Sequence, residues 1–585
     1  MGLAMKLTWW DEVHATLWRI ADRAELLKLR DEARLTARET VAPLLAQAHA
    51  ARGWTEEKAR VLSALDAQGL TGIPASARHG ITLPLALTVW ELASVDAGVA
   101  TCGLSGSLAQ MPIRDFGTPQ QRERYLHRAD LRHGALCLTE PLPGAGADAI
   151  SLSGRMALAG AGEDGEALLE IHKRGRFISH MDFAEFVVAA VEGDGKSVRG
   201  SALVILEPGD AGEFERGSLV RKLGHRLAST TDPVFRLTVP ASRIVGGYTM
   251  EEGTLVPRFS HRASLEPALR RMRALLALMT AAKALSTVRD GLCSLPQASS
   301  AEFRLSLADL WATGEAAASL GFCAARLCDE LDRAANPSSA DARLAALFSP
   351  AAKLFSSSRV PEPLRQAAAW GEFGAPASFD LHSRLLDAQI EDMYMGPAAL
   401  QRRLVSATMT GARFLAEVQE WTGEMNVLAE RLPQAGMSSL AQGMRLWHWT
   451  LERLRQKADA RGARLYCDAR QGVTFAMADA LCGLLAARSL ILDVMEMETD
   501  RHPPGSEYAS IYLDLSILAA GRAAARTAQT CVDLLFGYAD RFPVSDAERQ
   551  DFEKLRADLY ASLRGTLDAR ERIAEFLGGG GNIAP

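Results

Sequence analysis

The stretch "FSHRASLEPALRRMR" (259–273) gathers the ionisable side chains of His261, Arg262 and Glu266 on a helical pattern. Histidine and carboxylate side chains transfer protons when they are held within hydrogen-bond reach of a reacting group. Glu266 also lies directly before Pro267. An acid in that position is typical of the first turn of a helix, where the helix dipole stabilises it. The residues alone therefore favour a structural role for Glu266.

A second stretch, "QIEDMYMGPAALQRR" (389–403), places Glu391 and Asp392 four and three residues before Met395. On a helix these residues share one face, and we expect the two carboxylates to form a solvated edge. Met395 has no group that accepts a proton near neutral pH. Its flexible, apolar side chain suits the lining of a pocket or the filling of a space.

The composition disfavours several classes of protein. The chain has 585 residues, of which 48% are hydrophobic and 23% charged, with a formal net charge of -6. Binding to nucleic acid depends on neutralising phosphates with basic residues, so this function is disfavoured. The eight cysteines include no CxxC pair and no nearby histidine cluster, which predicts reduced and mostly buried thiols. The length predicts several domains.

No stretch reads as a signal peptide or a membrane span. The opening "MGLAMKLTWWDEVHATLW" soon meets acidic residues, and the apolar run that begins at Met272 contains Arg273 and Lys283. A signal peptide or a membrane-spanning helix would need an uninterrupted apolar core. We therefore expect a cytoplasmic protein.

One basic stretch in the C-terminal part carries two tryptophans, Trp447 and Trp449, within residues 444–465. A basic helix with tryptophans is also typical of segments that lie in a membrane interface. We favour packing inside a helical domain, or a dimer contact, so membrane association is not expected.

The elements that position these residues change twice along the chain. Apolar residues recur at three- and four-residue spacing up to about residue 130, which predicts helices. Short apolar and β-branched runs separated by turn residues then predict strands at 135–139, 167–172, 186–191, 201–206 and 234–239. From about Leu255 the helical period returns. The sequence thus predicts an α+β fold with domains at 1–130 (helical), 131–247 (β), 248–410 (helical bundle) and 411–585 (additional helices).

Six strings in this order resemble the motifs of the acyl-CoA dehydrogenase family, over roughly residues 25–410. They are "VWELASVDAGVAT" (89–101), "FGTPQQRERYL" (116–126), "LCLTEPLPGAGAD" (136–148), "GRFISHMDFAEFVVAA" (175–190), "KLGHRLASTTDPVFRLTVPASRIVGG" (222–247) and "DAQIEDMYMGPAALQRR" (387–403). The resemblance implies a helical domain, a β-barrel domain and a four-helix bundle. The additional helical block resembles that of the long members of the family.

The resemblance also implies FAD as cofactor and an acyl-CoA thioester as substrate. Leu138 and Thr139 match the strand that meets the flavin ring, and Phe177 and Ser179 match the aromatic and hydroxyl residues that flank it. Further along, Ala147 replaces a family serine, while the backbone loop is kept. Arg289 matches the arginine that binds the flavin pyrophosphate. Pro397 replaces a threonine on the dinucleotide side. The residues matching the ring half of the site are thus better kept than those of the dinucleotide half.

The family reaction removes a proton and a hydride from neighbouring carbons of the thioester, and the proton acceptor is a glutamate. Met395 stands at that position, so the usual base is missing. Some relatives carry the glutamate on an earlier helix, which here corresponds to 259–273. Its candidates for the base are His261 and Glu266, and Arg262 is the candidate for holding the substrate.

The resemblance leaves three functions open. The first is dehydrogenation of an acyl-CoA thioester with a relocated base. The second is a non-catalytic or partner subunit in a heteromeric complex, and the third is a flavin protein of the same fold with another activity. Either a homo-oligomer or a hetero-oligomer with a related subunit is expected.

Overall fold

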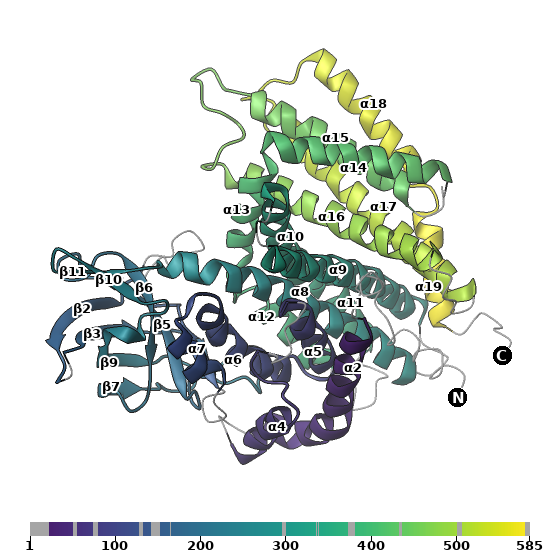
Figure 1. Ribbon diagram of the computed structural model, residues 1–585. Helices are drawn as coiled ribbons and strands as arrows, with labels where there is room; N and C mark the ends of the chain where they lie inside the picture. Colours follow the sequence, from purple (N-terminus) through teal and green to yellow (C-terminus); the bar gives the residue numbers. More distant parts are fainter. Residues whose placement is uncertain are drawn as a thin grey trace. The chain divides into compact units, whose positions relative to one another are not determined.

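The computed structural model describes residues 23–50, 55–73, 80–127, 133–141, 152–163, 165–294, 300–334, 336, 338–371, 381–431, 436–499 and 506–578. These residues divide into two compact units, Ala24–Leu275 and the part from Leu276 onward. The first unit contains the β-sheet and the helices that precede it, and the second unit is helical (Figure 1). The expected α+β class is confirmed, whereas the finer division into four domains stays a prediction.

Two of the helices that precede the sheet begin at residues whose side chains cap them. Asp96 accepts a hydrogen bond of 2.8 Å from the backbone of Val99, and Thr118 and Gln121 form a capping box; both arrangements satisfy free N–H groups of the first turn. A π-helical turn at Thr36–Val41 and a 3-10 turn that contains Pro43 interrupt the helical run of the first residues. The helices are α2 (Arg23–Leu35), α3 (Leu45–Ala50), α4 (Glu56–Ala67), α5 (Thr82–Val95), α6 (Ala97–Phe116) and α7 (Pro119–Leu126).

The main sheet contains all five strands that the sequence predicts. Its order is β1-β5-β2-β3-β9-β7, with β6 paired to β5. β1 and β2 run parallel to β5, and the other pairs are antiparallel. These strands are β1 (Gly134–Cys137), β2 (Arg155–Ala161), β3 (Ala167–Arg174), β5 (Phe186–Gly193), β6 (Ser201–Leu206), β7 (Ala211–Glu215) and β9 (Val234–Pro240).

Two short ladders complete the β part of the chain. β4 (Ile178–Ser179) pairs with β8 (Thr230–Thr231), and β10 (Tyr248–Glu251) pairs with β11 (Thr254–Pro257). The sequence did not predict these strands, because two- and four-residue segments are too short to show the alternation of a strand.

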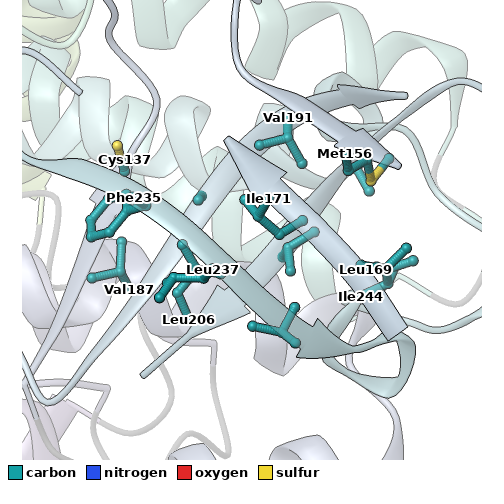
Figure 2. Packing of buried hydrophobic residues seen from close by; sticks show 14 of the residues in the cluster. Cys137, Met156, Leu169, Ile171, Val187, Val191, Leu206, Phe235, Leu237 and Ile244 are labelled. Carbon is teal, nitrogen blue, oxygen red and sulfur yellow. The ribbon is translucent and has the colours of Figure 1, made fainter. Parts of the chain in front are cut away.

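The curled sheet encloses one hydrophobic core (Figure 2). Along β3, Leu169, Ile171 and Lys173 are buried while the residues between them are exposed. This alternation follows from the period of two along a strand. Phe235 and Leu237 of β9 enter the same core from the neighbouring strand. Lys173 is thus a charged residue on the inward face of the sheet.

The charge of Lys173 is balanced by Glu140, which follows β1. Their side chains form an ion pair of 2.6 Å and are 0% and 2% exposed. The Glu140 carboxylate also accepts a hydrogen bond of 2.8 Å from the backbone of Gly154. Burial acts to raise the pKa of Glu140, but the Lys173 ammonium and the backbone donors outweigh it, so this pKa is lowered. The carboxylate is therefore held in its charged form.

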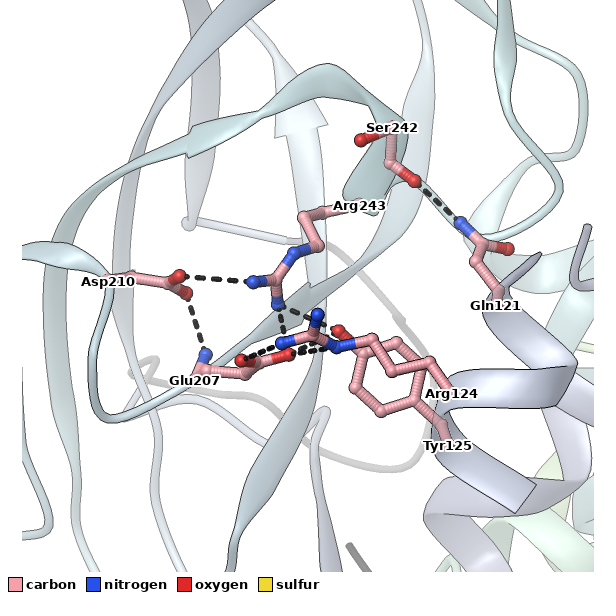
Figure 3. Close-up of polar contacts among 7 residues, drawn as sticks. All are labelled: Gln121, Arg124, Tyr125, Glu207, Asp210, Ser242 and Arg243. Carbon is pink, nitrogen blue, oxygen red and sulfur yellow. Dashed lines mark hydrogen bonds and ion pairs between the residues drawn. The ribbon is translucent and has the colours of Figure 1, made fainter. Parts of the chain in front are cut away.

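Helix α7 is attached to the sheet by a polar network (Figure 3). The Glu207 carboxylate accepts hydrogen bonds from Arg124, Tyr125 and Arg243. The Gln121 amide donates to the backbone carbonyls of Ser242 and Ile244, each at 2.7 Å. The start of α7 and the end of β9 are therefore fixed to one another.

The second unit is built entirely from helices in its described part. α8 (His261–Ser294) begins in the first unit and ends in the second. α9 packs against α10, α11, α16 and α19, and α17 packs against α15 and α16. The bounds are α9 (Ala301–Arg333), α10 (Ser339–Arg359), α11 (Pro361–Gly371), α12 (Leu381–Ile390), α13 (Ala398–Met409), α14 (Ala412–Arg431), α15 (Met437–Gln456), α16 (Gln471–Thr499), α17 (Ser506–Phe536), α18 (Asp546–Ser562) and α19 (Thr566–Leu577).

The tryptophan-containing stretch at 444–465 takes part in this helical packing. Trp447 on α15 is 0% exposed, and its indole N–H donates to the carbonyl of Met477 at 2.9 Å. Within α16, Gln471–Glu496 is long and apolar enough to cross a membrane, and 67% of its most apolar window is buried. A core helix of a helical domain has the same composition. The structure therefore supports the expectation that the residues around Trp447 pack inside a helical domain.

Replacement of Lys173 by Met should lower the free energy of unfolding of the first unit by about 3–5 kcal/mol, because it leaves the Glu140 carboxylate buried and unpaired. The matched control is Lys196→Met, which removes a lysine from an exposed turn and should change stability by less than about 0.5 kcal/mol. Chemical denaturation followed by circular dichroism measures both. Equal effects of the two substitutions would contradict the role given to the buried pair.

Candidate functional site

Three of the predicted flavin residues lie at one edge of the β part. The backbone N–H of Arg176 donates to the carbonyl of Thr139 at 2.9 Å, which joins the end of β1 to the start of β4. Ser179 pairs with Thr230 of β8. Thr139 is exposed and Ser179 is half-buried. Two residues with hydroxyl groups, Thr139 and Ser179, therefore belong to the same edge as Phe177.

Phe177 has an unusual environment for a phenylalanine. Its side chain is 52% exposed, and its backbone has a left-handed φ of 58°. The backbone N–H donates to the Asp232 carboxylate at 2.8 Å, and the Arg176 guanidinium lies 4.7 Å from the ring centroid. A bulky residue in left-handed backbone is strained, and such strain concentrates at functional positions. The exposed ring and the hydroxyl groups beside it would fit a flat, partly polar ligand.

Of the two other predicted flavin residues in the β part, the structure describes one, Leu138. Leu138 is half-buried against a hydrophobic cluster of the first unit, and its carbonyl accepts a hydrogen bond of 3.3 Å from Lys173. The buried pair between Lys173 and Glu140 thus also fixes the residues at the end of β1. Ala147 lies outside the residues that the structure describes.

The candidate base His261 faces the sheet at the start of α8. Its ring is 4% exposed, and Nδ1 lies 2.7 Å from the hydroxyl of Ser201 on β6. Nε2 is buried without a hydrogen-bond partner in the described part of the chain. Burial lowers the pKa of His261 to about 4, and the charges of Arg262 and Lys173 add to this effect. The imidazole is therefore neutral at pH 7 and is a weak base.

Glu266 and Arg262 lie on the more open side of the same helix. Arg262 is exposed. The Glu266 side chain is 52% exposed and forms an ion pair of 3.4 Å with Arg273, which is 5% exposed. α8 begins at His261 and contains Pro267, so the prediction of Glu266 as a first-turn acid was wrong. The helix begins earlier because its first turn is packed against β6 through His261.

The carboxylate of Glu391 is buried, so the prediction of a solvated edge was wrong for this residue. Its side chain is 0% exposed and forms an ion pair of 2.5 Å with Lys283. Thr280 donates a hydrogen bond of 2.7 Å to the other oxygen. Both partners lie on α8, in a stretch from Leu275 to Leu285 that is otherwise apolar. Asp392 is half-buried and accepts a hydrogen bond of 3.0 Å from Ser357.

Met395 lies in a tight turn between α12 and α13. Its φ is 56° and that of Gly396 is 86°. The Gln401 amide donates to the carbonyls of both residues, at 3.2 and 2.9 Å. Lys353 of α10 is 0% exposed and donates to the Gly396 carbonyl at 3.0 Å. The turn is therefore held by side chains that bind its backbone, while Met395 itself is half-buried.

Arg289, the predicted pyrophosphate residue, is part of an ion-pair network. Its Nε lies 3.1 Å from the Asp290 carboxylate, which also pairs with Arg384. Burial acts to raise the pKa of Asp290, but Arg384 and Arg289 outweigh it, so this pKa is lowered. Arg384 donates a second hydrogen bond to Thr287 at 3.1 Å. Through Asp290, these contacts join Arg289 near the end of α8 to Arg384 of α12.

The sequence did not reveal the residues that hold these segments in place. Lys283 and Glu391 are 108 residues apart, and Lys173 and Glu140 are 33 residues apart. The only signal was the presence of lysines in apolar stretches, since a lysine is almost never fully buried unless it is paired. That signal predicts that each lysine pairs with an acidic residue, but it does not show which acidic residue.

Comparisons with known proteins agree with this architecture. Residues 23–129 match the family model of the acyl-CoA dehydrogenase N-terminal domain. A search of curated protein sequences finds no significant match. Among solved structures, an acyl-CoA dehydrogenase complexed with FAD from Bacillus anthracis has a TM-score of 0.76 at 18% identity, and the match covers 95% of each chain.

Two further solved structures match a shorter part of the chain. Butyryl-CoA dehydrogenase from Megasphaera elsdenii has a TM-score of 0.52 at 23% identity, with 67% of this chain and 99% of that chain covered. Nitroalkane oxidase from Podospora anserina has a TM-score of 0.54 at 16% identity, with 67% and 96% covered. The fold of these two proteins therefore accounts for about two thirds of this chain, whereas the Bacillus anthracis protein also matches the additional helices. The chain has the acyl-CoA dehydrogenase fold, and its residues 23–129 belong to the acyl-CoA dehydrogenase N-terminal domain family.

Proposed function

We propose that this chain binds FAD at the edge formed by Thr139, Phe177 and Ser179 and oxidises an acyl-CoA thioester between its α- and β-carbons. The observation that carries the proposal is Phe177, whose ring is half-exposed and whose backbone is in the left-handed region, at an edge that also contains Thr139 and Ser179. Backbone strain of this kind clusters at ligand-binding and catalytic positions. One solved structure that resembles the chain over 95% of its length, an acyl-CoA dehydrogenase from Bacillus anthracis, is complexed with FAD.

The residues of this edge would orient the cofactor. Thr139 and Ser179 offer hydroxyl groups that donate to or accept from polar ring atoms, and Phe177 offers a flat apolar surface. When bound, FAD would accept the hydride that leaves the β-carbon of the thioester. Arg289, whose guanidinium is oriented by Asp290, would bind the pyrophosphate of a flavin held by a neighbouring subunit, as the family resemblance implies. The protein thus supplies binding and orientation, while the cofactor supplies the redox chemistry.

The proton acceptor is the open part of this mechanism. Met395 cannot serve, because a thioether has no basic group. Between the two predicted candidates, we favour Glu266. Its carboxylate is half-exposed, whereas His261 is shielded, bonded to Ser201 and weakly basic. Arg262, which is exposed on the same helix, would then hold the substrate beside it.

A partner subunit without its own base is the second candidate function. The observation that favours it is the environment of Met395, whose turn is kept in shape by Gln401 and Lys353 although the residue at its centre cannot accept a proton. Such a chain would bind flavin and rely on a related subunit for turnover. The match to a nitroalkane oxidase also shows that this fold occurs in a protein with another named activity.

Oligomeric state and location follow as further parts of the proposal. We expect an oligomer, either of identical chains or with a related subunit, in the cytoplasm. Size-exclusion chromatography with light scattering distinguishes a monomer from these assemblies, and co-purification of a second chain distinguishes a hetero-oligomer.

Phe177→Ala should reduce flavin binding. The purified chain should show visible flavin absorbance, and the variant should bind FAD roughly tenfold more weakly because it loses the aromatic contact. Met250→Ala, which truncates a side chain that is 51% exposed elsewhere in the β part, is the matched control and should leave flavin content unchanged. A colourless wild-type protein that FAD does not reconstitute would overturn the proposal.

Glu266→Gln should abolish most of the turnover while leaving the flavin bound. Loss of a general base typically costs a factor of 10² to 10⁴ in rate. Anaerobic addition of a set of acyl-CoA thioesters, followed by the bleaching of flavin absorbance, measures the reductive half-reaction. His261→Gln should retain bleaching at near wild-type rate. Full activity in Glu266→Gln would remove this residue as the base, and absence of bleaching in the flavin-containing wild type would favour the partner-subunit function.

The pH dependence of stability tests whether His261 is a buried neutral histidine. An unfolded histidine has a pKa near 6.5, and burial holds that of folded His261 at about 4. The unfolded state therefore binds more protons between these pH values, so stability should fall as the pH is lowered, by about 1.4 kcal/mol per pH unit for this residue. In His261→Gln that part of the slope should disappear. An unchanged slope would contradict the lowered pKa.

A further inference from the structure

A pocket within the second unit combines three arginines with a wall of small apolar residues. Its inner crevice, of about 40 Å³, lies among α9, α10, α16 and α17. The outer groove beside it, of about 270 Å³, lies among α9, α11 and α17. Arg522, Arg526 and Thr313 line both parts, and Arg359 lines the crevice. The apolar wall consists of Ala312, Ala316, Phe355, Ala480, Gly483, Ala487, Ala519 and Ala523.

Two of these arginines are uncompensated. Among the residues that the structure describes, Arg359 and Arg526 form no hydrogen bond and no ion pair, whereas Arg522 pairs with Asp309 at 2.5 Å. Unpaired arginines are ordinary on an open surface. Arg526 is exposed and Arg359 is half-buried. Both line a crevice in which the other polar side chains are those of Thr313, Thr530, Asp479 and Arg522.

The carboxylates that border the pocket are already paired with arginines elsewhere. Asp309 also binds Arg570, at 2.7 and 2.8 Å. Asp479 binds Arg402 at 2.9 Å. These pairs leave little negative charge to balance Arg359 and Arg526.

The third acidic side chain of the pocket, which lines the outer groove, is also paired. Glu362 binds Arg365 at 2.9 Å and accepts a hydrogen bond of 2.9 Å from Gln366. The arginines of the pocket are therefore balanced only in part by the carboxylates beside them, which are shared with Arg570, Arg402 and Arg365.

The arginines of the pocket also repel one another. The pKa of Arg526 is lowered to about 10, first because the surrounding protein removes part of its hydration and then because the charges of Arg359 and Arg522 oppose its own. The charges of Asp309 and Glu362 act to raise the pKa of Arg526, but they do not cancel the lowering. Like charges held together in a partly apolar site are destabilising unless a ligand of opposite charge lies between them.

We propose that this pocket binds a small polyanion that carries phosphate or carboxylate groups. The planar guanidinium groups of Arg359 and Arg526 are suited to bind such groups with two parallel hydrogen bonds. The outer groove has the volume for a small molecule, and the crevice has room for only a single group of it. None of the residues proposed for FAD or for the thioester lines this pocket, so the inference does not rest on the proposed function.

Calorimetric titration of the full chain with pyrophosphate, and separately with citrate, tests the site and distinguishes the two kinds of anion. At least one of them should bind and should raise the melting temperature. Arg526→Gln should weaken that binding at least tenfold, and the double variant Arg359→Gln, Arg526→Gln should abolish it. Arg461→Gln, which removes an exposed arginine in a loop of the same unit, is the matched control and should bind as the wild type does.

The melting temperature without added anion provides a second measurement, which also shows whether the variants fold. Arg526→Gln should melt at the same or a higher temperature than the wild type, because the substitution removes repulsion from Arg359 and Arg522. The pocket is not an anion site if neither pyrophosphate nor citrate binds the wild type, or if both bind Arg526→Gln as tightly as the wild type.

Discussion

The buried ion pair between Lys173 and Glu140 is the constraint on which the candidate cofactor edge depends. Thr139 lies beyond the last residue of β1, so the strand ladder does not fix its position. The next residue, Glu140, does so, because its carboxylate is bonded to Lys173 inside the core and to the backbone that precedes β2. An unpaired charge in that core would be strongly destabilising, so the end of β1 cannot move without cost. Phe177 is then placed through the hydrogen bond from Arg176 to Thr139.

The segment around Met395 is held in a comparable way. Lys283 binds the buried carboxylate of Glu391, and Lys353 binds the backbone of the turn at Gly396. Both lysines are buried and come from helices that are distant in sequence from the turn. The shape of this segment is therefore maintained independently of the side chain at position 395, which is why a methionine can occupy it without loss of the turn.

More of the fold than of the candidate site could be predicted from the sequence. Strands such as β6 (Ser201–Leu206) were predicted at their observed bounds, because continuous β-branched and apolar runs indicate buried strands. β2 was missed, since "RMALAGA" is rich in Ala and Gly and has weak strand propensity. The burial of Glu391 was mispredicted because local spacing shows which residues share a helix face but not what covers that face. The left-handed backbone of Phe177 and Met395 has no sequence signal, since neither residue type favours it.

The order of the strands has a consequence for how the chain folds. The candidate edge depends on pairs between distant residues, such as Gly134 with Phe186 and Ile178 with Thr231. The hairpin of β2 and β3 instead joins neighbours in the sequence. Loop closure between distant segments has an entropic cost that local pairs avoid, so such contacts form later. Thr139, Phe177 and Ser179 would therefore come together only after most of the sheet has formed, so the candidate cofactor edge would be among the last parts of the β region to take shape.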